Sequence, residues 1–142
     1  NLRIKDKSEI REICKFAKKC DKKLVAIFCC YTWCDEQLIP NTPFDVLAYF
    51  KGADYIITDT FHGTIFSIIN EKKFCTIIRN TNIQKLTSLL NNLSLETRIV
   101  DNISNLENIL TTSISYGKVN NLLENERLIT NDYLKRALTD LN

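Results

Sequence analysis

Short apolar strands alternate with amphipathic helix patterns along this chain, and that alternation limits what the chain can fold into. Residues 24–30 are apolar on both faces, as expected of a strand buried inside a parallel sheet. Further strands are predicted over residues 55–58, 74–78 and 98–100. Because alternating strands and helices pack as a sheet covered on both sides, the sequence predicts an α/β fold with a Rossmann-like parallel sheet flanked by helices.

The segments between the strands have helical periodicity. Helices are predicted over residues 6–20, 42–52, 61–70, 82–93 and 104–110. Capping signals begin four of them: Asp6 with Glu9, Thr42 with Asp45, Thr60 or Asp59, and Ser104 with Glu107. Residues 31–41 are predicted to be a loop, and the tail, residues 116–141, to be two helices broken near Thr130.

Composition excludes several functional classes. The 142 residues fit one domain, so residues 1–142 are predicted to form a single unit. The net charge is +2 with Lys and Arg spread along the chain, which gives no basic stripe for nucleic acid. No apolar run approaches the length of a membrane span, and the charged start is not a signal peptide. The chain lacks an initiator Met, so we expect it to be a piece of a longer protein.

Six cysteines are present, but no C-x-x-C pair, so neither a zinc site nor any other metal site is predicted. A disulfide framework is also not expected in a chain with this much ordinary core. We interpret the cysteines as reduced thiols that pack as small hydrophobes in a cytoplasmic protein.

The chemistry is concentrated where the strand at residues 55–58 meets the next helix. Thr58, Asp59, Thr60 and Thr64 surround this point, and His62, the only histidine, lies in the first helical turn. Ligands of open α/β sheets bind outside the carboxyl ends of the strands, and a helix N-terminus there suits a phosphate or carboxylate. Gly63 would let a ligand or a neighbouring backbone come close. The alternative interpretation is structural: a satisfied histidine, Asp59 as a helix cap, and Thr64 packed on the helix.

Residues 58–69, read as Thr-Asp-Thr-Phe-His-Gly-Thr-Ile-Phe-Ser-Ile-Ile, closely resemble the hallmark of the polysaccharide pyruvyl transferase family. In that family a strand ending in Thr-Asp-Ser precedes Phe-His-Gly and an apolar helix. Residues 43–47 and 52–54 are similar to the family's lead-in helix. Weaker similarity follows downstream, in the strand from Phe74, in residues 89–93 with Arg98, and in the tail.

The resemblance implies a GT-B-like architecture of two Rossmann-type halves with the active site between them. This chain would be the C-terminal, donor-binding half, with the N-terminal half absent and the fragment inactive alone. Members transfer pyruvyl from phosphoenolpyruvate to hydroxyls of a cell-surface or exopolysaccharide sugar, often as a ketal, so the partners are that donor and a glycan or lipid-linked acceptor. No cofactor is expected. The location implied is cytoplasmic, or peripheral at the inner face of the membrane.

The resemblance assigns His62 as the catalytic residue, as a proton donor or acceptor or as a cation that holds the phosphate. The substrate-binding residues predicted around it are Thr58, Asp59, Thr60, Gly63, Thr64 and Arg79. Some branches of the family carry an arginine where Thr60 stands, so another cation must meet the donor. The candidates are Arg3, Arg79 and Arg98, or a residue of the other half. Arg79 follows a strand, although a solvated loop charge is the simpler interpretation.

Two other functions remain open from the sequence. The chain could be half of a GT-B glycosyltransferase that binds a nucleotide sugar, although no G-x-G-x-x-G loop or ribose-binding acid is evident. It could also be a degenerate, non-catalytic module that binds glycans or supports assembly.

Overall fold

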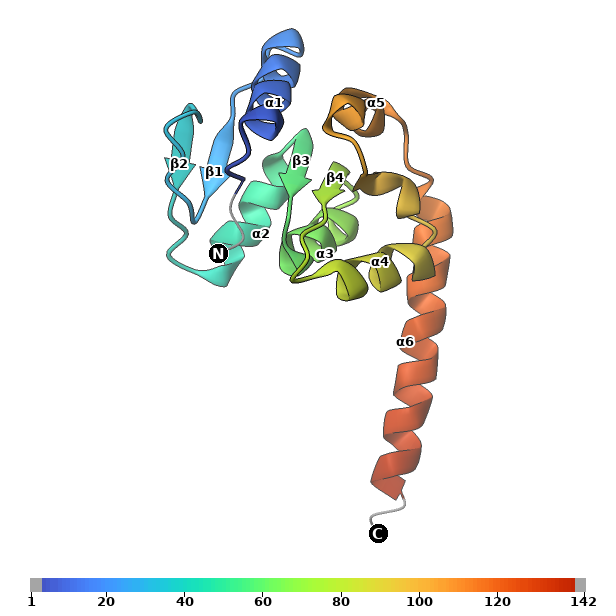
Figure 1. Ribbon diagram of the computed structural model, residues 1–142. Coiled ribbons are helices and arrows are strands. Elements are labelled where there is room, and N and C mark those ends of the chain that lie inside the picture. The colour runs from blue at the N-terminus through green and yellow to red at the C-terminus, as the bar shows by residue number, and fades with distance from the viewer. Residues whose placement is uncertain (1–3, 140–142) are drawn as a thin grey trace.

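Parallel strands and flanking helices make up the part of the chain that the computed structural model describes, residues 4–139 (Figure 1). In chain order the elements are α1 (Lys7–Lys19), β1 (Val25–Ile27), β2 (Glu36–Leu38), α2 (Pro43–Gly52), β3 (Tyr55–Thr58), α3 (Phe61–Ile69), β4 (Lys73–Ile77), α4 (Ile83–Asn92), the 3-10 turn η1 (Glu96–Arg98), β5 (Ile99–Val100), the 3-10 turn η2 (Ile103–Asn105), α5 (Leu106–Thr111) and α6 (Tyr116–Thr139). The predicted α/β class, with parallel strands between helices, is confirmed.

The strands form two parallel sheets rather than the single sheet that the sequence predicts. β1 pairs with β2, and β3, β4 and β5 form a second sheet in that order. In the second sheet Thr58 of β3 lies beside Thr76 of β4, which in turn lies beside Ile99 of β5. Because the strands are parallel and in chain order, the ends of β3 and β4 lie at the same edge of the sheet, and the loops that follow them meet there.

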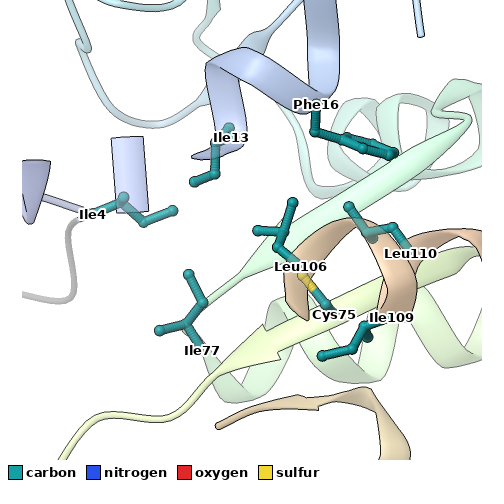
Figure 2. Packing of buried hydrophobic residues seen from close by; sticks show 8 residues of the cluster. All are labelled: Ile4, Ile13, Phe16, Cys75, Ile77, Leu106, Ile109 and Leu110. Carbon is teal, nitrogen blue, oxygen red and sulfur yellow. The ribbon is translucent and has the colours of Figure 1, made fainter. Parts of the chain in front are cut away.

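One face of this sheet is covered by α1 and α5. Cys75 and Ile77 of β4 are buried against Ile13 of α1 and Leu106 of α5 (Figure 2). All six cysteines are free, and burial raises the pKa of the Cys75 thiol to about 12. This cysteine therefore packs as a small hydrophobe, as predicted.

The other face is covered by α3, α4 and the first turns of α6. Phe74 of β4 is fully buried there, with Ile68 of α3, Leu90 of α4 and Val119 of α6 around it. Successive residues of β4 thus enter two different cores, which explains why this strand is apolar on both sides.

Local capping signals form as predicted at the first two helices. The Asp6 carboxylate accepts the backbone N–H groups of Ser8 and Glu9 at the start of α1. Thr42 and Asp45 form a complete capping box at the start of α2. The predicted box of Ser104 with Glu107 is wrong, because Ser104 donates to Asn102, which begins the 3-10 turn η2.

Two other predictions are corrected by the structure. Residues 31–41 are not a plain loop, because they contain β2, whose Glu36 and Gln37 are exposed and so give no apolar strand signal. The tail is not broken near Thr130: α6 is one continuous helix that extends beyond the body of the domain (Figure 1). Within residues 4–139, no helix combines the length and the apolar character that a membrane crossing requires.

Candidate functional site

Thr60 begins α3 and fixes the turn between β3 and that helix. Its Oγ1 accepts the backbone N–H of Gly63 at 3.0 Å, so Thr60 rather than Asp59 is the helix cap. The backbone N–H of Thr60 in turn donates to Oγ1 of Thr58 at 3.2 Å. The last residue of the strand and the cap of the helix are therefore joined directly, which gives the corner a defined shape.

Gly63 is required at this corner because the threonines approach it closely. A Cβ atom at this position would lie 2.2 Å from Oγ1 of Thr58 and 2.7 Å from Oγ1 of Thr60. Real Cβ atoms do not come so near to other atoms, so any side chain here would force the threonines that shape the corner to shift. The atoms that come close to Gly63 are thus the side chains of Thr58 and Thr60.

One pair of hydroxyl groups links the inner side of α3 to β4. Thr64 is fully buried; its Oγ1 donates to the carbonyl of Thr60 at 2.9 Å and lies 3.1 Å from Oγ1 of Thr76. Ser67, also fully buried, donates to the carbonyl of Gly63. The Thr64–Thr76 contact links the helix to the sheet, and the other two bonds lie along the helix itself. All three point toward the interior rather than toward solvent.

His62 lies on the opposite, outer side of the first turn of α3 and is exposed. Its ring is flanked by two aromatic rings of the same helix, with centroids 6.1 Å away for Phe61 and 6.4 Å away for Phe66. Within residues 4–139 the backbone N–H groups of Phe61 and His62 have no hydrogen-bond partner. The corner therefore combines an exposed imidazole with two N–H groups that have no partner among the described residues, a combination that can receive an anion.

Asp59, beside this corner, is held by Arg79 from the loop after β4. Nε of Arg79 donates to Oδ2 of Asp59 at 3.2 Å, and the two terminal nitrogens donate to the carboxylate of Glu9 in α1 at 2.6 and 2.8 Å. The Asp59 side chain is 7% exposed and that of Arg79 is 26% exposed. Hydrogen bonds to Glu9 and Asp59 raise the pKa of Arg79 above its ordinary value.

Asn82 completes this network, and sequence reasoning missed it. Its side-chain amide donates to the carbonyl of Asp59 at 2.8 Å, and its Oδ1 accepts the backbone N–H of Arg79 at 3.0 Å. Glu9 was interpreted only as a capping residue. The signal that could have found Asn82 is its position three residues after Arg79, in the loop at the same edge of the sheet.

A family model described as polysaccharide pyruvyl transferase matches residues 1–81, which is more than half of the chain. The chain belongs to this family. No curated protein and no solved structure matches it.

The family match includes the whole β3–α3 corner as well as Arg79 and Glu9. It also takes in residues 1–41, for which the sequence alone suggested no likeness, and it ends before Asn82. The similarity noted further downstream, around Arg98 and in the tail, stays a prediction.

The other candidate cations lie elsewhere. Arg98 is 2% exposed, and its terminal nitrogen donates to the carbonyls of Ile109 and Thr112. Arg3 lies outside the described residues. In the part of the chain that the structure describes, no three His, Cys, Asp or Glu side chains group so as to hold a metal ion.

Proposed function

We propose that this member of the polysaccharide pyruvyl transferase family carries the donor site for phosphoenolpyruvate, and that His62 contacts the donor. The acceptor is proposed to be a sugar hydroxyl of a bacterial cell-surface or exopolysaccharide glycan, free or lipid-linked. The chain would form one half of a GT-B-like enzyme, and the other half would supply the second wall of the active site.

The exposed imidazole of His62 at the N-terminus of α3 carries this proposal. Phosphoenolpyruvate has a phosphate and a carboxylate, and both are recognised by free backbone N–H groups at a helix start. The ring is not packed in either core, so it is available to a ligand. Thr58, Thr60, Gly63 and Thr64 support the proposal indirectly, since they fix the corner from which the ring projects.

The reaction that we propose needs one proton at carbon. The methylene carbon of phosphoenolpyruvate takes a proton and becomes a methyl group, and a sugar hydroxyl bonds to the neighbouring carbon. The bond from that carbon to the phosphate oxygen then breaks, and a second hydroxyl of the sugar takes its place to give the ketal. Of the two hydroxyl protons, one replaces the proton used at the methylene carbon and the other leaves with phosphate.

His62 has two possible tasks in this sequence. An imidazole can both donate and accept a proton, so His62 can deliver or remove the proton, a contribution of about 100-fold to 10,000-fold in rate. As an imidazolium it could instead hold the departing phosphate. These tasks differ in what they predict for binding, because only the second makes His62 important for affinity toward phosphoenolpyruvate.

The test is His62→Ala in the full-length enzyme, measured as phosphate release from phosphoenolpyruvate with a panel of glycan acceptors. We expect turnover to fall by about 100-fold or more. Ile69→Ala is the matched control, since Ile69 is 58% exposed at the far end of the same helix. A normal affinity for phosphoenolpyruvate with lost turnover identifies proton transfer, and lost affinity identifies anion binding.

Near-normal pyruvyl transfer by His62→Ala would remove His62 from the mechanism. Thermal-shift measurements then separate the remaining functions. Stabilisation by a nucleotide sugar but not by phosphoenolpyruvate would favour a glycosyltransferase half. A full-length protein with intact His62 that turns over no glycan would favour a binding or assembly module.

A further inference from the structure

We propose that Arg79 is a positioning residue that orients the corner bearing His62, rather than the cation that binds the donor. This inference rests on the proposed function of His62. It differs from the expectation that Arg79 contacts substrate, and it follows from what already surrounds the guanidinium.

Two carboxylates occupy the guanidinium of Arg79. Three of its five N–H groups are used, two in a paired contact with Glu9 and one with Asp59. Paired contacts of this kind are strong and directional, and both acids are largely shielded, with side chains 13% and 7% exposed. The arginine is therefore fixed in place before any ligand arrives.

The charge of this cluster is unfavourable for a donor anion. Two carboxylates face one guanidinium, so the cluster as a whole is negative. A phosphoenolpyruvate molecule that approached Arg79 would meet the charge of Asp59 at close range, and little of the arginine's positive field would remain for it. The missing positive charge at the donor site must come from another source.

Hydrogen bonds through Asp59 connect Arg79 to the turn that carries His62. Arg79 holds the side chain of Asp59, while Asn82 holds the main-chain carbonyl of the same residue. Asp59 is followed directly by Thr60, the cap of α3. A residue clamped at both its side chain and its main chain cannot turn, so the direction in which α3 begins is set by the loop after β4.

Through Glu9, α1 also takes part in this arrangement, together with the loop after β4 and the turn before α3. Glu9 is 70 residues from Arg79 in sequence and lies in α1, and its carboxylate stops the arginine from rotating away. Glu9 thus reaches the corner through its contact with Arg79. Glu9→Gln therefore separates the two interpretations, because it lowers kcat if Arg79 positions the corner and tightens donor binding if Arg79 binds the donor.

The experiment compares Glu9→Gln and Arg79→Lys in the full-length enzyme, with Lys85→Ala, an exposed residue of α4, as the control. If Arg79 positions the corner, both variants lower kcat by roughly 10-fold or more, and neither variant tightens phosphoenolpyruvate binding. If Arg79 binds the donor, Glu9→Gln frees its charge and tightens phosphoenolpyruvate binding, and Arg79→Lys weakens it. The second pattern would overturn the proposal.

A spectroscopic measurement keeps this test separate from that of the proposed function. The ring Cε1–H resonance of His62 can be assigned by its disappearance in His62→Ala. We expect this resonance to move in Glu9→Gln and Arg79→Lys and to stay in place in Lys85→Ala. An unmoved resonance in both variants would refute positioning even if His62 proves catalytic, and a moved one supports positioning even if His62 proves dispensable.

Discussion

Two arginines of the second sheet show opposite ways of keeping a charged group inside a small domain. Arg79, in the loop after β4, is 26% exposed on its side chain and is bound by two carboxylates. Arg98, just before β5, is 2% exposed and is bound by the carbonyls of Ile109 and Thr112. The first is matched by full negative charges and the second only by dipoles.

The difference shows in the pKa of each side chain. Hydrogen bonds to Glu9 raise the pKa of Arg79, whereas burial lowers that of Arg98. Nε of Arg98 is buried without a hydrogen-bond partner among the described residues. Arg98 also borders a cavity of about 100 Å³ between the end of α4 and the start of α6. We infer that Arg98 serves stability by satisfying the last carbonyls of α5, while Arg79 serves the geometry of the site.

The largest expected effect on stability is that of replacing Arg98, and it sharpens the contrast between the two arginines. Arg98→Met should lower the free energy of unfolding by about 3 kcal/mol, because the buried carbonyl of Ile109 and the part-buried carbonyl of Thr112 lose the donor that the guanidinium supplies. Urea denaturation followed by circular dichroism measures this. Lys118→Ala is the control, since Lys118 lines the same cavity but is exposed. A loss no greater than that of the control would mean that the buried charge contributes nothing net.

A second prediction compares the packing around two glycines, Gly63 in the first turn of α3 and Gly117 in the first turn of α6. Gly63→Ala should cost about 2 kcal/mol of unfolding free energy, because the new Cβ would lie 2.2 Å from Oγ1 of Thr58. Gly117→Ala, in the first turn of α6, meets nothing within 4 Å and should be neutral or stabilising by up to about 1 kcal/mol.

A double variant tests whether the clash with Thr58 explains the cost of Gly63→Ala. In the double variant with Thr58→Ala, thermal denaturation should show that part of the loss is recovered, because the clashing oxygen is gone. Strictly additive losses would show that the threonine is not what excludes a side chain there.

The β3–α3 corner could be predicted from the sequence because its determinants are local. Thr58, Thr60 and Gly63 lie within six residues of one another, and the apolar strand before them has a clear pattern. The same holds for the capping box at Thr42. Short-range hydrogen bonds of this kind depend little on the rest of the fold, so residue types at fixed spacing are enough to infer them.

Long-range partners could not be predicted in the same way. Asp59 and Arg79 were each expected at the carboxyl edge of the sheet, but not bound to each other, since they are 20 residues apart and Glu9 is 70 residues from Arg79. The pairing depends on how α1 packs against the second sheet. β2 was missed for a related reason, because an exposed edge strand is defined by its neighbour β1 and not by its own composition.

The smallest expected effect concerns Tyr116, which lies near Arg98 but is bound elsewhere. Its hydroxyl donates to the carbonyl of Lys72, just before β4, so Tyr116→Phe should cost about 1 kcal/mol at neutral pH. Burial raises the pKa of Tyr116 above its ordinary value of 10.0. Above pH 10 the unfolded chain therefore loses this proton while the folded chain keeps it, and stability falls as pH rises. Denaturation of both proteins from pH 7 to pH 11 should show a difference that shrinks at alkaline pH; a constant difference would mean that Tyr116 titrates as freely in the folded protein as in the unfolded chain.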